Sequence, residues 1–144
     1  MEHSFHSGLL LQYSALREIF KDKNEFIYIH IHRELTDMIV IKEGLCRHIA
    51  TLPFGISTIL KKIANSNKES LDTSDSILSL YQGHKLNDTE MGRIDKIITP
   101  IMNKWSSDCI NSIKNSLDIT SIPRTVYLSA HSHFDLFKGA LVAS

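Results

Sequence analysis

Three short runs of strand-forming residues follow one another between residues 26 and 51, with only a few residues between them. Two of them, Phe26 to His32 (FIYIHIH) and Thr36 to Ile41 (TDMIVI), are rich in β-branched and aromatic residues, and residues 45–51 (LCRHIAT) form the third. Gly44 can adopt the positive φ of a tight turn between the second and third runs. Connections this short predict a three-stranded antiparallel meander.

The periodicity changes from strand to helix at Pro53-Phe54-Gly55, a combination that ends a strand. Beyond it, apolar residues recur at helical spacing, which predicts helices over residues 56–64, 72–80 and 88–117. Ser70 or Asp72 is expected to cap the second helix, and Pro100 to kink or split the third. The apolar stripe around Trp105 in the third helix is interpreted as core, with an interface as the alternative.

Further elements are predicted on both sides of this region. A helix is expected over residues 9–20 (LLLQYSALREIF), ahead of the strands. A buried strand over residues 125–128 (TVYL) and a helix over residues 134–141 follow the Ile122-Pro123 break. The predicted order is helix, three strands, three helices, strand and helix, in a single α/β domain over residues 1–144.

Composition excludes several classes of protein. The chain has 144 residues, 42% of them apolar, which is enough for one buried core. Sixteen Lys and Arg balance sixteen Asp and Glu, so no basic field favours nucleic acid as a partner. Cys46 and Cys109 lack CxxC spacing, which fits reduced thiols in a cytoplasm better than a zinc or redox motif. Direct membrane insertion is not expected, because no segment approaches the roughly 18 consecutive apolar residues of a span.

The order of elements resembles one ribonuclease H-like lobe of the superfamily that contains actin, hexokinase and Hsp70. Three passages carry a closer resemblance to the second lobe of FtsA-type and PilM-type proteins. HIHRELTD at 30–37 stands where those families have D-I-G-G-G-T-T-D around the ATP phosphates, and LPFGISTI at 52–59 contains their P-x-G-x-x-x-I passage. LSAHSH at 128–133 stands at their adenosine-binding L-T-G-G-G-S turn. The resemblance covers about residues 10–142 and implies an actin-like lobe.

The loops that bind ATP in those families have lost their glycines here. A phosphate loop needs glycine because backbone N–H groups must approach the anion closely, and His32, Arg33 and Glu34 stand at those positions. His30 replaces the acidic residue that helps to organise the metal ion and the attacking water. The adenosine turn has Ala130-His131 in place of its two glycines. Efficient ATP hydrolysis is therefore not expected, and the resemblance implies a lobe without catalytic residues.

The resemblance assigns a set of altered nucleotide-loop positions to this chain. They are His30, His32, Arg33, Glu34, Thr36, Asp37, Ser129, Ala130 and His131. Thr36 and Asp37 still match the family motif, and the first interpretation is that they suit a strand start and a turn. The alternatives are a relic of the phosphate loop, or weak residual nucleotide binding with Arg33 supplying a charge. No catalytic residue, metal ligand or cofactor is assigned, and weak binding of ATP with Mg²⁺ is the alternative.

Two other kinds of site are disfavoured. His30 and His32 share a strand face, and the loop with His131 and His133 is expected near the same sheet end, but no acidic or cysteine residue is spaced to complete a transition-metal site. A ribonuclease H-type nuclease needs a carboxylate where His30 stands. The acidic residues that do not restore that set are Asp37, Asp118 and Asp135.

The resemblance implies a scaffold or protein-interaction role in bacterial cell division or pilus assembly. Its partner would be another protein or a second copy, and its place the cytoplasm, peripheral to the inner membrane through partners. The alternative is a weak ATP-binding lobe of a larger actin-like ATPase. Because no first phosphate loop precedes residues 9–20, the chain is expected to be either a fragment of a two-lobed protein or a lobe that acts alone.

Overall fold

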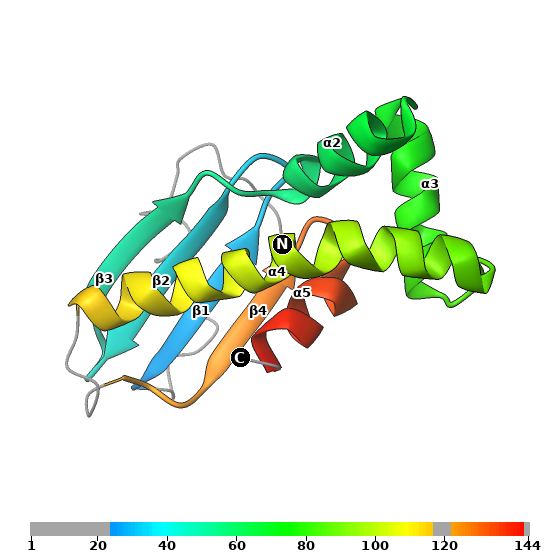
Figure 1. Cartoon of the computed structure of the whole chain (residues 1–144). Coiled ribbons are helices and arrows are strands. Elements are labelled where there is room, and N and C mark those ends of the chain that lie inside the picture. Colours follow the sequence, from blue (N-terminus) through cyan, green and yellow to red (C-terminus); the bar gives the residue numbers. More distant parts are fainter. Residues whose placement is uncertain (1–23, 117–121, 143–144) are drawn as a thin grey trace.

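A computed structural model describes residues 24–116 and 122–142, and the helix predicted over residues 9–20 lies outside them. The strands and helices of the described residues follow the predicted order (Figure 1). They are β1 (Phe26–Ile31), β2 (Thr36–Lys42), β3 (Leu45–Leu52), α2 (Ile56–Asn67), α3 (Leu71–Gln82), α4 (Asp88–Ser116), β4 (Val126–Ala130) and α5 (Phe134–Val142).

The described strands form one sheet in the order β3-β2-β1-β4. The first three make the predicted antiparallel meander, and the turn between β2 and β3 has φ of 55° at Glu43 and 72° at Gly44. β4 returns parallel to β1. The prediction that β4 is a buried strand is wrong: its residues are half-buried and Val126 is 46% exposed. Among the described strands β4 pairs only with β1, so it lies at an edge of the sheet.

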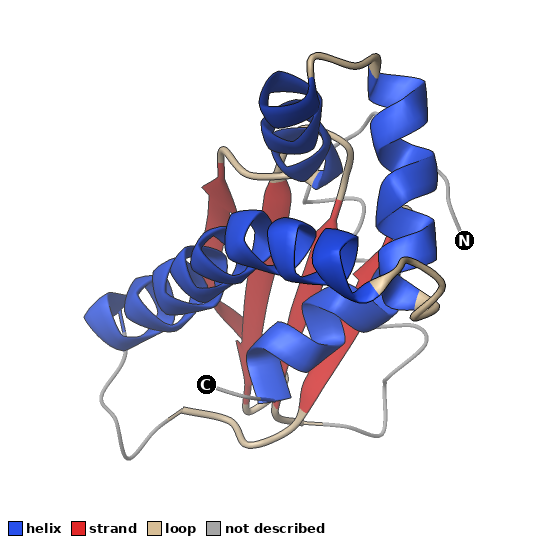
Figure 2. Cartoon of the chain, turned by 45° about the vertical axis from the view of Figure 1, so that its right-hand side comes forward, coloured by secondary structure: helices blue, strands red, loops and turns tan. Residues whose placement is uncertain are grey.

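The two faces of the sheet carry different apolar clusters because side chains alternate along a strand. Ile27, Ile29 and Ile31 of β1 belong to the main core, on the face that α4 and α5 cross (Figures 1 and 2). Phe26 belongs to a second cluster with Ile39 and Ile41 of β2, joined by half-buried side chains. Those half-buried members are Tyr28, Cys46 and Tyr127.

A β-bulge between Val40 and Ile41 changes which face part of β3 presents. On one side of the bulge Val40 pairs with His48, and on the other Ile41 pairs with Cys46. Cys46 therefore packs against the second cluster, whereas His48 faces α4, where its Nε2 lies 3.2 Å from Ser112 Oγ. Simple alternation would have put Cys46 and His48 on the same face.

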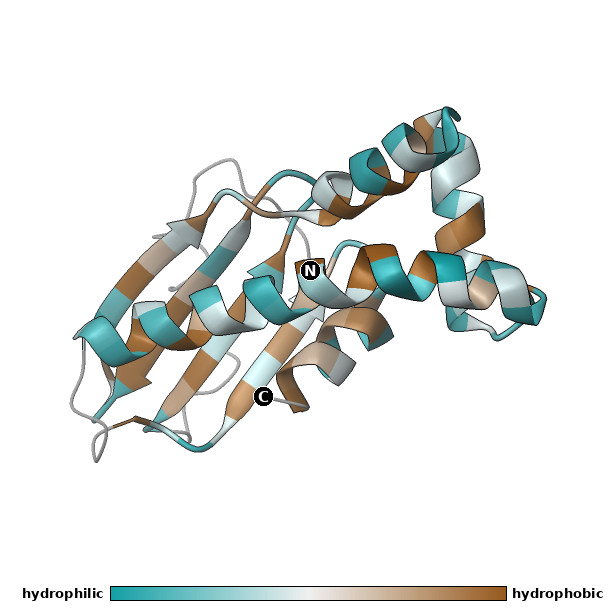
Figure 3. Ribbon diagram, in the orientation of Figure 1, coloured by the Kyte–Doolittle hydropathy of each residue, from teal (hydrophilic) through white to brown (hydrophobic). Residues whose placement is uncertain are grey.

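α4 spans 29 residues and is continuous, so of the two effects expected at Pro100, a kink or a split, the split is wrong. Proline removes the hydrogen bond to the carbonyl four residues earlier, but both Pro100 and Lys96 are exposed and water can take that bond. The buried stripe of α4 confirms the interpretation of this helix as core, and Figure 3 shows it as apolar bands between hydrophilic turns. Its buried apolar members are Ile94, Ile98, Met102, Trp105, Cys109 and Ile113.

The caps of the shorter helices follow local chemistry. α2 ends at Lys68 in the left-handed conformation, within one residue of the predicted Asn-Ser-Asn stop. Of the two cap candidates for α3, the structure selects Ser70, whose Oγ accepts a hydrogen bond from the Thr73 amide at 3.1 Å. Over residues 24–116 and 122–142, no helix combines the length and apolarity that crossing a bilayer requires.

Candidate functional site at the carboxyl ends of β1 and β4

The two loops that the resemblance compares with nucleotide-binding loops meet at one end of the sheet. β1 and β4 are parallel, so the carboxyl ends of both strands lie at the same end of the sheet, with His30 beside Ser129 and Ile31 beside Ala130. The His131 amide continues this pairing by donating to the Ile31 carbonyl at 2.9 Å. Segments separated by about a hundred residues thus form one candidate site. The two loops were expected near the same end of the sheet.

His30 and Ser129 contact each other across the β1–β4 pair. His30 Nδ1 and Ser129 Oγ share a short hydrogen bond, and Tyr28 Oη lies 2.7 Å from the same Oγ. Tyr28 is a site residue that the motifs did not point to, although strand alternation places it on the same face as His30, two residues away. The hydroxyl of Ser129 is therefore engaged within the lobe.

Asp37 is held by two neighbours. The residue is 8% exposed; its Oδ2 accepts from His32 Nε2 at 2.8 Å and its Oδ1 accepts from Thr51 Oγ1 at 2.8 Å. Thr51 is a site residue that sequence reasoning missed. It could have been found from the β2–β3 register, which pairs Asp37 with Thr51. The rings of His30 and His32 meet edge to face, with centroids 4.3 Å apart. Both carboxylate oxygens of Asp37 have protein partners.

Thr36 is fully buried and joins the meander to α4. Its Oγ1 donates to the Phe54 carbonyl at 2.7 Å and accepts from Trp105 Nε1 at 3.1 Å. Trp105 was interpreted as part of a core stripe, with an interface as the alternative, so its polar contact was missed. Its indole N–H is a donor that a buried position must satisfy. The Thr36 hydroxyl thus fixes the strand start, the Pro-Phe-Gly turn and α4 together.

The loop between β1 and β2 is fastened to the start of α2 through its carbonyl groups. The Ile56 amide donates to the His32 carbonyl at 3.1 Å, and the Ser57 amide donates to the Arg33 carbonyl at 2.8 Å. The Thr58 amide donates to the Gly55 carbonyl at 3.0 Å. A helix start usually offers such amides to anions, but the first amides of α2 already have carbonyl acceptors.

The tip of this loop faces solvent. Arg33 and Glu34 are exposed, and Glu34 Oε1 lies 3.8 Å from Lys61 Nζ, a separation that contributes little in water. Within the described residues, the backbone amides of Arg33 and Glu34 make no hydrogen bond. Neither residue has the positive φ common in anion-binding loops. Two open amides and one guanidinium are the groups at this tip that an anion could still contact.

The β4–α5 loop sends its two histidines in different directions. His131 is exposed, whereas the His133 side chain is 8% exposed and bridges to α3. His133 Nδ1 lies 2.7 Å from Gln82 Oε1, and Nε2 lies 2.6 Å from Asp75 Oδ1. Ala130 packs against the main core. The structure therefore uses His133 as a tie between the loop and α3, a role that nothing local in the sequence indicated.

The described residues contain no group of three or more His, Cys, Asp and Glu side chains that could hold a metal ion. The nuclease alternative also considered two carboxylates outside β2. Asp135 is exposed in the first turn of α5, and Asp118 lies outside the described residues. The site combines buried internal contacts with an exposed loop tip.

Comparisons with known proteins give the fold. No protein-family model matches the chain, and no curated protein sequence matches it either. Among solved structures, the ethanolamine utilization protein EutJ from Carboxydothermus hydrogenoformans is similar with a TM-score of 0.66 and 22% identity, over 90% of this chain and 44% of that one. A chain of the PilM-PilN type IV pilus biogenesis complex is similar with a TM-score of 0.66 and 18% identity, over 92% of this chain and 38% of that one.

An archaeal actin homolog is similar with a TM-score of 0.59 and 13% identity, over 89% of this chain and 45% of that one. This chain thus spans less than half the length of each of these three proteins. The shared part contains the meander, the helices, a further strand and the last helix, in the order that the sequence predicted. The parallel pairing of that further strand with β1 was not predicted. The chain therefore has the α/β, ribonuclease H-like fold of one lobe of an actin-like ATPase.

Proposed function

We propose that this chain is a non-catalytic actin-like lobe that acts as a scaffold or protein-interaction module. It binds another protein or a second copy of itself, in the cytoplasm and at the inner membrane only through partners. The process is pilus assembly or cell division. A structural neighbour belongs to a pilus biogenesis complex, which supports the first of these processes.

The observation that carries the proposal is the docking of the β1–β2 loop on α2. The carbonyl groups of His32 and Arg33 accept hydrogen bonds from the first two amides of α2. In the family that the chain resembles, this is the place where the polyphosphate binds, so these two amides are not free to bind it here. The two carboxylates at the site also argue against metal binding. Asp37 accepts hydrogen bonds from His32 and Thr51, and Glu34 is exposed at the loop tip. Metal-assisted hydrolysis needs free carboxylates and approachable amides together.

Nucleotide binding tests the non-catalytic part of the proposal. A fluorescent ATP analogue with Mg²⁺ is titrated against this chain and against the longest natural product that contains it. We expect no saturable binding and no phosphate release in either, while an actin-like ATPase with intact glycine loops gives both in the same assay. Micromolar binding by the longer product would contradict the proposal.

The interaction part needs its own test. Sedimentation velocity over a wide range of concentration measures self-association of the chain. A photo-reactive amino acid at Ile49, which is 44% exposed on β3, or at Leu80, 41% exposed on α3, then reports contacts in cells. If the contact is specific, one of the two positions gives one dominant cross-linked protein or a cross-linked dimer, and the other position gives none. A monomer without cross-links at either position counts against an interaction role.

A weak nucleotide-binding lobe is the second candidate, and the open amides of Arg33 and Glu34 are the observation that favours it. The exposed Arg33 guanidinium can add a charge-assisted hydrogen bond to phosphate. In that case Arg33→Ala weakens binding of the ATP analogue to the longer product. Arg47→Ala, an exposed arginine on β3, serves as the matched control and leaves binding unchanged.

A further inference from the structure

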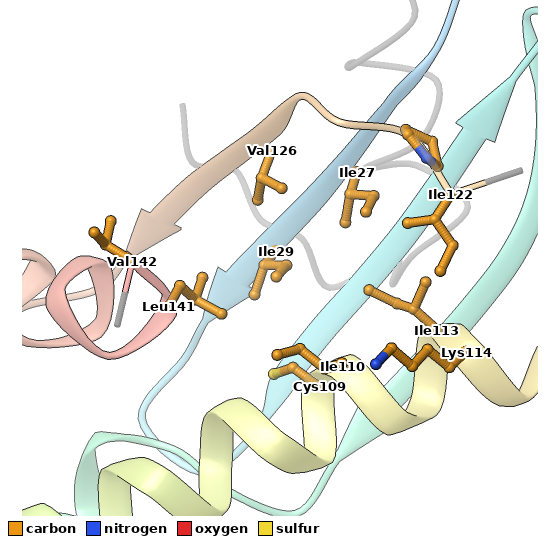
Figure 4. A pocket seen from close by; sticks show the side chains of 11 residues that line it. Ile27, Ile29, Cys109, Ile110, Ile113, Lys114, Ile122, Val126, Leu141 and Val142 are labelled. Carbon is orange, nitrogen blue, oxygen red and sulfur yellow. The ribbon is translucent and has the colours of Figure 1, made fainter. Parts of the chain in front are cut away.

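An apolar pocket of about 370 Å³ lies between α4, α5 and the sheet, toward the amino-terminal ends of β1 and β4 (Figure 4). Its position follows from how the two helices meet. Trp105 of α4 and Phe137 of α5 contact edge to face, with centroids 5.0 Å apart. The pocket lies beyond that contact, where its walls come from the last turns of both helices. It is separate from the loops at the carboxyl ends of the strands.

The pocket has a buried aliphatic floor and an open mouth. Ile27 and Ile29 of β1 form part of the floor and are 3% and 2% exposed, and Ile113 of α4 is 6% exposed. The mouth includes Val126 of β4, which is 46% exposed, and Val142 of α5, which is 77% exposed. Large exposed aliphatic side chains around a hollow mark a binding site more often than isolated ones do.

The described residues that line the pocket carry few polar groups, and their charge is positive. Lys114 is the only charged residue among the described lining residues, and it is exposed. No ion pair or hydrogen bond of its side chain is found within the described part of the chain. The Cys109 thiol also lines the pocket, but burial raises its pKa to about 12, so the thiol is neutral at physiological pH. Within the described part of the chain, the lining therefore offers aliphatic surface and a single ammonium group.

We propose that this pocket binds a straight-chain fatty carboxylate of medium length, with its alkyl chain on Ile27, Ile29 and Ile113 and its carboxylate beside Lys114. The volume falls in the lower part of the range of small-molecule sites. One ammonium matches one carboxylate, whereas a phosphorylated headgroup is usually met by several cations or donors. The described lining residues include none of the hydroxyl and amide side chains that orient sugars or nucleobases.

Calorimetry with the full chain tests this binding directly, using octanoate, decanoate, dodecanoate and decanol. Affinity should rise by about fourfold for each added methylene until the pocket is full. Decanoate should bind more tightly than decanol because only the acid pairs with Lys114. Lys114→Gln should weaken decanoate by about tenfold and leave decanol unchanged. Lys96→Gln, on an exposed turn of the same helix outside the pocket, is the matched control.

A second variant blocks the pocket without touching the core. Val142→Trp adds a bulky group at the exposed mouth, so it should weaken all four ligands while the melting temperature stays unchanged. Equal affinity for decanoate and decanol, no dependence on chain length, or no binding of any ligand would each overturn the proposal. So would binding to phosphatidylglycerol vesicles without binding to free decanoate, since the acyl chains would then come from a bilayer. These outcomes do not depend on whether the lobe binds ATP or a protein.

Discussion

Gly55 lies so close to Arg33 that a β-carbon at position 55 would stand 2.4 Å from the Arg33 carbonyl oxygen. Gly55→Ala is therefore expected to displace the loop from α2 and lower the free energy of unfolding by about 1–3 kcal/mol, as overpacking does. Gly92→Ala is the control, because nothing lies within 4 Å of its added β-carbon in α4. That change should stabilise the chain by about 0.5–1 kcal/mol. Urea unfolding measures both, and equal effects would show that the loop adapts freely.

The buried hydroxyl of Thr36 gives a second prediction. Thr36→Val keeps the shape but leaves the Phe54 carbonyl and the Trp105 indole N–H without a partner. We expect a loss of about 2–4 kcal/mol in the free energy of unfolding, because unsatisfied buried groups keep their desolvation cost. Thr36→Ser retains the hydroxyl and should lose clearly less. The fluorescence of Trp105, the one tryptophan in the sequence, follows the transition. A serine variant as unstable as the valine variant would contradict this account.

His133 combines a left-handed backbone, with φ of 55°, and two side-chain hydrogen bonds to α3. Both His133→Ala and His133→Gly lose these bonds, but only glycine relieves the backbone strain. The glycine variant should therefore be the more stable of the two by about 1 kcal/mol. At exposed His131, which lacks a positive φ, the order should reverse. Chemical denaturation of the four variants measures the difference in stability between glycine and alanine at each position. The same order at both positions would contradict the proposed backbone strain at His133.

Stability should fall at alkaline pH because buried groups resist ionisation. Burial, with a smaller effect of Asp108, raises the pKa of Cys109 from 9.0 to about 12. Burial and the hydrogen bond to Asp95 raise the pKa of Tyr81 from 10.0 to about 12. The unfolded chain releases these protons first, so the folded state loses stability as the pH rises from about 9 to 12. For Cys109 the limit is about 1.4 kcal/mol per pH unit.

Urea unfolding between about pH 8 and 10 separates the two groups in this alkaline effect. Cys109→Ala should flatten the decline between pH 9 and 10, even if it lowers stability throughout by leaving a cavity. Tyr81→Phe should retain the decline in that interval, because an unfolded tyrosine ionises only near pH 10. An unchanged slope in the alanine variant would mean that the Cys109 thiol ionises in the folded state.

The elements could be predicted from the sequence because each carries a local signal. Alternation in FIYIHIH, the glycine turn after β2 and the serine ahead of α3 act over a few residues and set strands, turn and cap. The meeting of the two loops was predicted only through the family resemblance. The exposure of β4 was not predictable, since TVYL is apolar on its own and its burial depends on which neighbours the sheet supplies.

The contacts that define the site were harder to predict because they join distant residues. The tie from His133 to Asp75 spans 58 positions, and that from Trp105 to Thr36 spans 69. Neither pair has a sequence pattern, because a single hydrogen bond between elements leaves no periodicity. The face on which Cys46 lies could not be predicted, because the LCRHIAT run looks regular whereas a bulge of one residue reverses the strand alternation.

The parallel pairing of β1 with β4, which joins His30 to Ser129 across 99 positions, has a consequence for folding kinetics. Closing a loop of that length costs entropy before any pairing energy is gained, whereas the meander closes over a few residues. We expect the meander and the helices to form early and β4 to dock late. In pulsed hydrogen exchange, the amides of β4 should gain protection after those of β2, and simultaneous protection would oppose this order. The candidate site and the apolar pocket both need β4, so neither exists until the last step of folding.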